Sequence, residues 1–388
     1  MTTHFDFPKA LLERESRQLY RRRRVLETAQ GAEVVVDGHA CVAFCSNDYL
    51  GLANHPQVVT AFQNTANQYG VGAGASHLIS GHMSPHHALE EELADFVGTE
   101  RALLFSTGYM ANLGVINAVV GRGDEIFADK LNHASLLDGA LLSAARLWRY
   151  PHGDMDALER LLSRPLGGRR LLCSDGVFSM DGDLAPIDVL ATLAAKNKAR
   201  LLIDDAHGFG VLGEQGRGSL EQLGLSQGPP LILMATLGKA LGCFGAFVAA
   251  EEALIETLIQ LARTYVYTTA LPPAVAEAAR ASLRLVRQDA ARREQLWVLV
   301  QRFRHGSAEL GLNVTPSTTP IQPLVLGDSQ RVLDASAALE QRGFFVTAIR
   351  PPTVPVGSAR LRITLSAVHT PEQVDRLLEA LAEVCGHG

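Results

Sequence analysis

Lys239 and the residues around it are the first candidates for chemistry. The apolar run 231–236 has the composition of a strand, and it leads through Leu237 and Gly238 to a single lysine followed by small and apolar residues. A lysine in such surroundings has little access to bulk water, and desolvation disfavours its ammonium form. A neutral amine is the form that reacts with an aldehyde. The alternative is a surface lysine whose stem packs on the protein while its charge reaches solvent.

A second group of reactive side chains precedes this lysine. The apolar residues 201–203 lead into Asp204, Asp205 and His207, which stand where a strand is expected to end. Open α/β sheets place their ligands at the carboxyl ends of their strands. A carboxylate at that edge can hold a pyridine nitrogen protonated. Lysine for the aldehyde and aspartate for the pyridinium are the two partners expected of pyridoxal phosphate.

The composition restricts the kind of protein that can carry these groups. The chain has 388 residues, of which 47% are hydrophobic and 20% charged, enough for one large core and a smaller domain. A net charge of −6 argues against a nucleic-acid partner, so an anionic substrate must be met by local arginines. The first residues lack the pattern of a signal peptide, and no apolar run reaches membrane-spanning length. We therefore expect a cytoplasmic protein without a membrane partner.

The cysteines predict neither disulfides nor a metal centre. They are odd in number and scattered: Cys41, Cys45, Cys173, Cys243 and Cys385. Four of them lie in apolar or small-residue surroundings and are interpreted as reduced core thiols. Cys41 and Cys45 could suggest a metal-binding pair. No second cysteine or histidine pair with ligand spacing accompanies them. We expect no metal site.

The motifs Asp204-Asp-Ala-His-Gly208 and Thr236-Leu-Gly-Lys-Ala-Leu-Gly242, in this order and spacing, resemble those of the α-oxoamine synthases. The resemblance covers almost the whole chain and implies the α/β fold of fold-type I pyridoxal-phosphate enzymes. It implies a large domain with a mostly parallel central sheet covered by helices, a smaller α+β C-terminal domain and an N-terminal arm. The expected divisions are residues 1–45 for the arm and a hairpin, 46–285 for the cofactor-binding domain and 286–388 for the small domain. Periodicity predicts helices at 7–30, 84–97 and 275–310.

The resemblance also assigns residues to the cofactor. Residues 103–112 have the pattern of a strand, a glycine and a helix start, which is a natural phosphate site. His133 matches a histidine that stacks over the pyridine ring and also meets substrate, and Lys239, Asp204 and His207 complete the catalytic set. The expected cofactor contacts within one chain are Gly108, Tyr109, His133, Ser179, Asp204, His207, Thr236 and Lys239. A hydroxyl at Thr268 or Thr269 is expected from the neighbouring subunit, which makes a homodimer part of the catalytic unit.

The substrates follow from the same resemblance. Within the family the chain is most similar to the branch of biotin biosynthesis, which implies L-alanine and a pimeloyl thioester of coenzyme A or acyl carrier protein. Arg360, Arg362 and Thr364 share one strand face by alternation, and a guanidinium suits a carboxylate. The expected amino-acid contacts are Asn47 and Arg362, and the expected contacts of the acyl partner are Arg21, Arg350 and Thr353.

The same motifs allow three other interpretations of the protein's function. Related synthases that use glycine or serine share the chemistry, and a few side chains decide between them. Gly238-Lys239 could suggest a nucleotide-binding loop, but Ala240 and Leu233 do not fit that motif, and the glycines of residues 69–77 are misplaced for a dinucleotide loop. A non-catalytic scaffold subunit is a third alternative. The residues Ala75, His77 and Asp175 depart from the family pattern.

Overall fold

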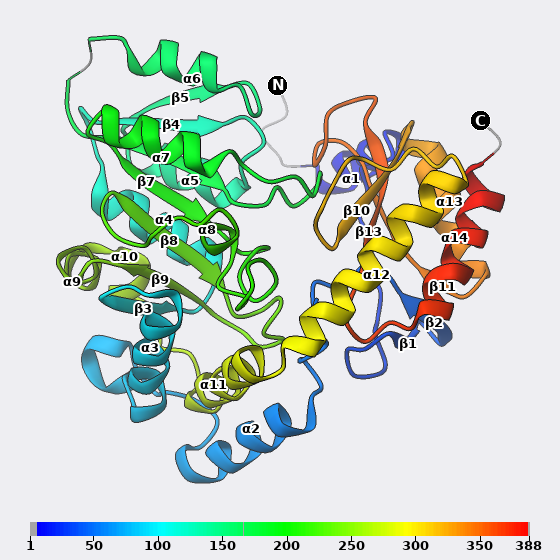
Figure 1. Ribbon diagram of the computed structural model, residues 1–388, viewed down its shortest axis with the longest axis horizontal. Helices are drawn as coiled ribbons and strands as arrows, with labels where there is room; N and C mark the ends of the chain where they lie inside the picture. Colours follow the sequence, from blue (N-terminus) through cyan, green and yellow to red (C-terminus); the bar gives the residue numbers. More distant parts are fainter. Residues whose placement is uncertain (1–5, 166, 387–388) are drawn as a thin grey trace. The chain divides into compact units, whose positions relative to one another are not determined.

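The structure is a computed structural model that describes residues 6–165 and 167–386 (Figure 1). These residues form two compact units. The larger unit comprises residues 47–179 and 183–294, and the smaller unit comprises residues 6–46, 180–182 and 295–386. None of the described helices combines the length and the hydrophobicity needed to cross a membrane.

A seven-stranded sheet forms the centre of the larger unit. Its strands, in spatial order, are β3 (Arg101–Phe105), β9 (Ala246–Ala250), β8 (Leu231–Thr236), β7 (Arg200–Asp204), β6 (Arg170–Asp175), β4 (Glu125–Asp129) and β5 (Arg146–Tyr150). Only β9 runs antiparallel to its neighbours. The inner strands are buried along almost their whole length, as expected of a parallel sheet covered on both faces, and Figure 1 shows helices on both sides. The predicted mostly parallel sheet is confirmed.

Helices alternate with these strands along the chain. They are α2 (Pro56–Tyr69), α3 (Ser84–Val97), α4 (Gly108–Val119), α5 (Ala134–Leu142), α6 (Met155–Leu162), α7 (Ile187–Lys196), α8 (Ser219–Gln222), α9 (Glu252–Leu261), α10 (Arg263–Val266) and α11 (Pro273–Gln288). A single π-helical turn, η1 (His77–Gly81), precedes α3. The helix predicted at 84–97 is confirmed, and its residues Leu89, Leu93, Phe96 and Val97 are buried.

The smaller unit joins the two ends of the described chain. β1 (Glu33–Val36) and β2 (His39–Ala43) form a hairpin, and β11 (Phe344–Phe345) pairs with β2 in parallel. A second sheet contains β10 (Ile321–Gly327), β13 (Ala359–Thr364) and β12 (Thr347–Ile349) in that order. The remaining helices are α1 (Phe7–Ser16), α12 (Ala290–Glu309), α13 (Ser329–Gln341) and α14 (Pro371–Cys385).

The helix predicted at 7–30 is wrong beyond Ser16. Helix α1 buries none of its residues, so no packed face supports its extension through the arginine run that follows. Arg24 instead forms ion pairs with Asp37 and Glu340, which requires a chain that has left the helix. By contrast, the helical region predicted at 275–310 is confirmed, with one interruption at Asp289 between α11 and α12.

Candidate active site

A cavity of about 190 Å³ lies in the larger unit. Its lining residues follow the carboxyl ends of several strands: Gly108, Tyr109, His133, Ser135, Asp175, Ser179, Asp204, Ala206, His207, Met234, Thr236 and Lys239. Every residue that the sequence analysis assigned to the cofactor within one chain is in this set. The structure therefore brings together side chains that are separated by up to 131 positions in the sequence, between Gly108 and Lys239.

The parallel sheet explains this convergence. Asp204 is the last residue of β7 and Thr236 is the last residue of β8, and the two strands are hydrogen-bonded neighbours. Residues that follow parallel strands leave the sheet at one edge, where connections to the helices begin. Lys239 follows β8 by three residues, in a turn where the Gly242 amide donates to the Lys239 carbonyl at 2.8 Å. The lysine is half-buried at the cavity wall.

Asp204 is held in place by groups of the protein. The amide Nδ2 of Asn112 donates to its Oδ2 at 2.7 Å, and the backbone N–H of Ala206 donates to its Oδ1 at 3.1 Å. Asn112, from helix α4, is fully buried. These two hydrogen bonds fix the position of the Asp204 carboxyl group, which lines the cavity. Asn112 could not be assigned to the site from the sequence, because only the fold brings α4 to β7.

The adjacent carboxyl group, Asp205, has a different environment. It does not line the cavity, and its Oδ2 accepts the backbone N–H of Ser219 at 2.8 Å. Added Cβ atoms at Gly208 and Gly218 would lie 2.1 Å and 1.9 Å from its oxygens, so the chain encloses this carboxyl tightly. Burial raises the pKa of Asp205 to about 7. Successive residues at a strand end face opposite ways, which separates the two carboxyls.

His133 combines a structural contact with a place in the cavity. It precedes α5, and its Nδ1 lies 2.8 Å from the Ser135 hydroxyl and 3.3 Å from the Ser135 amide, which it caps. Its backbone N–H donates to Asp175 Oδ2 at 2.7 Å. Burial lowers the pKa of His133, although the nearby Asp204 opposes this effect. A neutral imidazole at the cavity wall is a flat surface suited to an aromatic ring.

Asp175 is the departure from the family pattern that the structure explains most directly. It ends β6, lines the cavity and is buried. Burial, with the negative charge of Asp204 as a further cause, raises the pKa of Asp175 well above its usual value. Its contact with the His133 backbone shows that the short side chain reaches the loop that positions this histidine.

A chain of polar groups connects His207 with Asn47. The Tyr49 hydroxyl lies 2.7 Å from His207 Nδ1 and 3.2 Å from Asn47 Oδ1. Tyr49 is fully buried, so its hydroxyl needs such partners. Asn47 and His207 were predicted from the sequence as site residues, whereas Tyr49 was not. Its position two residues after Asn47 in a polar turn was the available signal.

The start of helix α4 provides an anion site at the cavity. Thr107 caps the helix by accepting the Met110 amide at 3.2 Å, and Gly108 begins it. Backbone N–H groups at a helix start and the helix dipole favour a phosphate. With this site, a lysine amine, a supported carboxylate and a neutral imidazole, the cavity offers what pyridoxal phosphate requires of a protein, and the residues fit that cofactor.

Thr268 and Thr269 do not belong to the described lining of this cavity. Thr269 pairs with Ser76 in an isolated antiparallel bridge, and its carbonyl accepts the Ser106 hydroxyl at 3.5 Å. The expectation that one of these threonines serves the phosphate of a neighbouring subunit stays a prediction.

Within the smaller unit, the structure brings together residues expected to contact the acyl partner. Arg21 Nη2 donates to Thr353 Oγ1 at 3.0 Å, and Arg350 Nη2 donates to the Tyr20 carbonyl at 2.8 Å. The arm before the hairpin therefore lies against residues 350–353. The arginines of this run differ in their contacts, since Arg24 forms ion pairs with Asp37 and Glu340 instead.

The arginine strand β13 is buried along its whole length. Arg360 donates to Asp181 Oδ1 and to the Met180 carbonyl, and Thr364 donates to the Ser46 carbonyl at 2.8 Å. The side chain of Arg362 is buried, with 7% of the residue exposed, which rules out a solvated face. A carboxylate-binding role for this face stays a prediction.

Comparison with known proteins gives the family. The aminotransferase class I and II family matches residues 39–381. The chain belongs to this family. It is 61% identical to an 8-amino-7-oxononanoate synthase of Methylococcus capsulatus, covering 98% of each chain, and 58% identical to one of Cellvibrio japonicus, covering 99% and 97%. The resemblance to the α-oxoamine synthases is thereby confirmed.

Solved structures agree on the fold of this aminotransferase-family chain. A serine palmitoyltransferase of Sphingomonas wittichii superposes with a TM-score of 0.93 at 31% identity, covering 99% and 98% of the two chains. A serine palmitoyltransferase with bound pyridoxal phosphate superposes with a TM-score of 0.92 at 30% identity, covering 98% and 97%. The chain is a pyridoxal-phosphate-dependent acyltransferase of fold type I, and pyridoxal phosphate is its cofactor.

Proposed function

We propose that the chain condenses L-alanine with a pimeloyl thioester, of coenzyme A or acyl carrier protein, in biotin biosynthesis. The products are 8-amino-7-oxononanoate, carbon dioxide and the free thiol carrier. The observation that carries the proposal is the convergence of Lys239, Asp204, His133 and His207 on one cavity. The curated relatives at 56–61% identity, all named for this product, support the choice of substrates.

Each cavity residue has a task in this proposal. When bound, pyridoxal phosphate supplies an electron sink that stabilises negative charge at the α-carbon of an amino acid. Lys239 would hold the cofactor aldehyde, and its amine, when free, would move the α-proton. Asp204, held by Asn112, would keep the ring nitrogen protonated. His133 would pack against the ring, and His207, whose Nδ1 contacts the Tyr49 hydroxyl, would hydrogen-bond near the ring oxygen.

The remaining assigned residues select the substrates. Asn47 and the buried Arg362 hold the alanine carboxylate, since a guanidinium binds a carboxylate in two parallel hydrogen bonds. The acyl partner meets Arg21, Arg350 and Thr353, and a pimeloyl group ends in a carboxylate that suits the two arginines. Thr268 or Thr269 of a neighbouring subunit closes the phosphate site in a cytoplasmic homodimer.

An absorbance titration of the purified enzyme tests the assignment. The cofactor spectrum is recorded as L-alanine and then pimeloyl-coenzyme A are added, with glycine and L-serine as parallel additions, and the product is identified by mass. We expect a change with alanine, a further transient change only with the thioester, and the mass of 8-amino-7-oxononanoate. A colourless protein that binds no cofactor would instead support a scaffold role.

A serine- or glycine-using synthase is the second candidate. The solved serine palmitoyltransferases share the fold closely, so the fold by itself does not separate the two activities. Their 30–31% identity, against 56–61% for the 8-amino-7-oxononanoate synthases, favours alanine. Turnover with serine or glycine in place of alanine would keep the cofactor assignment and overturn the substrate.

A further inference from the structure

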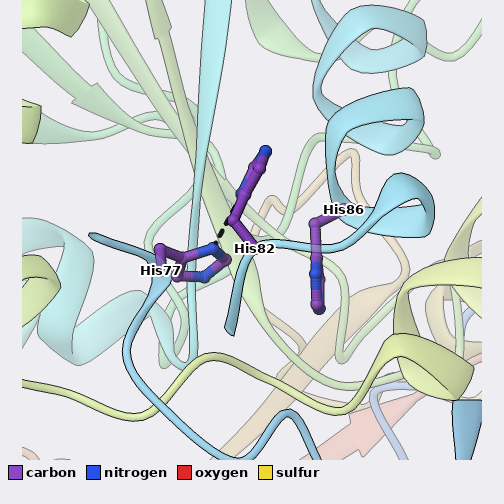
Figure 2. Close-up of side chains that lie close together, drawn as sticks. All are labelled: His77, His82 and His86. Carbon is purple, nitrogen blue, oxygen red and sulfur yellow. Dashed lines mark hydrogen bonds between the residues drawn. The ribbon is translucent and has the colours of Figure 1, made fainter. Parts of the chain in front are cut away.

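Three histidines gather in the larger unit outside the lining of the cofactor cavity. His77, His82 and His86 each offer one ring nitrogen, and these three atoms all lie within 4.8 Å of one another. Figure 2 shows the rings of His77 and His82 joined by a hydrogen bond, with His86 beside them. His77 and His86 are buried, whereas His82 reaches the surface, so the cluster is accessible from one side.

The spacing of two of these nitrogens is close to that of metal ligands. His77 Nδ1 and His82 Nδ1 lie 2.9 Å apart. Two imidazole nitrogens bound to one tetrahedral zinc ion, at about 2.0–2.1 Å from it, are separated by about 3.3 Å. In this hydrogen bond one Nδ1 carries the proton. Both nitrogens become ligands when that proton moves to Nε2 of the same ring and the two nitrogens separate by a few tenths of an ångström. Metal binding requires neutral imidazoles.

The backbone holds the first two histidines in this arrangement. The π-turn η1 (His77–Gly81) places a wide loop between them, closed by the Gly81 amide donating to the Ser76 carbonyl at 2.9 Å. A Cβ at Gly81 would lie 2.1 Å from the Ala75 carbonyl oxygen, so only glycine permits the turn. The His77 ring also stacks on Tyr265, with centroids 5.0 Å apart and an interplanar angle of 11°. Isolated π-turns are frequent at functional sites.

The third histidine has the hydrogen bonding of a supported ligand. His86 Nε2 donates to the buried Leu271 carbonyl at 2.7 Å, and its Nδ1 accepts the Met83 amide at 2.9 Å. The lone pair is therefore on Nδ1, and binding an ion exchanges the amide for the metal. Ligating histidines typically donate their other N–H to a carbonyl or carboxylate. His82 Nε2 lies 4.0 Å from the Glu90 carboxylate, which is too far for a hydrogen bond, so Glu90 contributes only a nearby negative charge.

We propose that His77, His82 and His86 form a site for a divalent transition-metal ion of the zinc class. Three imidazoles suit zinc, nickel or copper and leave a fourth position to water on the exposed side. The site lies beside residues 268–271, because the Ala270 amide donates to the Ala75 carbonyl at 2.9 Å and His86 bonds Leu271. A bound ion ties this segment to the start of α3.

Equilibrium dialysis of the cofactor-loaded enzyme against zinc tests the site. The chain is purified without a histidine tag, and bound metal is counted by plasma mass spectrometry. We expect one zinc per chain, lost in His82→Asn and in His77→Phe, which keeps the aromatic stack on Tyr265. Glu90→Gln keeps the acceptor for the Leu104 amide and removes only a charge near His82, so it should weaken zinc binding less than the two histidine variants do.

Two control variants give the test its specificity. His305→Ala removes an exposed histidine on α12 and is expected to change nothing. His87→Ala removes one member of the neighbouring group His82, His87 and Glu90, which could also hold an ion, and leaves the three proposed ligands in place. Zinc lost in His87→Ala but kept in His77→Phe would place the ion in that group and overturn the proposal. No stoichiometric zinc, or zinc kept in His82→Asn, would overturn it as well. Zinc binding is measured without turnover. A failure of the proposed function and a failure of the metal site can therefore be told apart.

Discussion

The cofactor cavity and the histidine cluster are assembled in opposite ways. The cavity collects residues from five connections that follow β3, β4, β6, β7 and β8, all at one edge of a buried sheet. The cluster takes its three proposed ligands from residues 77–86: His77 begins the π-turn η1, His82 directly follows it, and His86 lies in the first turn of α3. The first depends on long-range packing and the second on local backbone geometry. Substitutions should therefore damage one site and spare the other.

Lys239→Ala should have the largest effect. We expect turnover to fall by at least about 10³-fold, because the lysine both holds the cofactor and moves the α-proton. Zinc binding at the cluster and the far-UV circular dichroism should not change. The matched control is Lys196→Ala, which removes an exposed lysine paired with Glu159 at 2.7 Å. Steady-state kinetics of both variants decide the point, and a Lys239→Ala enzyme with near-normal turnover would refute the assigned role.

Asp204→Asn and Asp205→Asn separate two adjacent carboxyls at the same strand end. Asp204→Asn should lower turnover by about 10²–10³-fold, since it removes the charge opposite the ring nitrogen. Asp205→Asn should leave turnover nearly unchanged but alter how stability depends on pH.

The burial of Asp205 determines whether stability rises or falls with pH. Its pKa is raised from 3.8 to about 7, so the folded state binds the proton more tightly than the unfolded state. Stability therefore falls as pH rises from about 4 to 7, by roughly 4 kcal/mol if this carboxyl acts alone. Urea unfolding between these pH values should show a shallower fall in Asp205→Asn. Equal slopes for the variant and the parent would contradict the assignment.

Gly81→Ala should break the cluster and spare the cavity. The new Cβ meets the Ala75 carbonyl, and we expect a loss of about 1–3 kcal/mol in unfolding free energy together with weaker zinc binding. Cofactor binding should be retained. Gly72→Ala, where an added Cβ meets nothing within 4 Å, is the control and should be neutral. Thermal unfolding and metal analysis of the pair measure both effects, and an equally stable Gly81→Ala would show that the turn tolerates a side chain.

Among these substitutions, His152→Asn should have the smallest effect, which is on the free energy of unfolding. His152 Nδ1 lies 3.1 Å from Asp129 Oδ1 and Nε2 lies 2.9 Å from Asp183 Oδ2, and these hydrogen bonds raise the pKa of His152 to about 10. The stabilisation is complete below about pH 6.5 and is lost as pH rises towards 10. Because the ring is about one-third exposed, we expect only about 1 kcal/mol.

The test for His152 is the change in unfolding free energy between pH 6.5 and 10. The parent should lose stability across this interval more steeply than His152→Asn. Parallel curves would mean that the histidine does not titrate with the two carboxylates.

The sequence predicted most of the cavity for a physical reason. Apolar strands followed by polar residues identify strand ends, and a parallel sheet places such ends on one edge. Asp204 and Lys239 could therefore be predicted from the sequence to lie at one site. The helix at 84–97 could also be predicted, because Leu89, Leu93, Phe96 and Val97 recur at helical spacing. The family resemblance supplied the individual contacts that periodicity alone does not give.

Some supporting groups could not be predicted because their partners are distant in the chain. Asn112 contacts Asp204 only after α4 has packed on the sheet, and Tyr49 reaches His207 across 158 positions. The helix expected at 17–30 failed for the same reason, since Arg24 is drawn to Asp37 and Glu340, and the latter is 316 positions away.

The sequence by itself determined the helices at 84–97 and 275–310 and the reactive residues at the strand ends, because each depends on local spacing. Tertiary structure alone decided that β11 joins the N-terminal hairpin, that Asp204 rather than Asp205 lines the cavity, and that three histidines face one another around a π-turn. These outcomes depend on which surfaces pack together, and local residue patterns do not specify such long-range contacts.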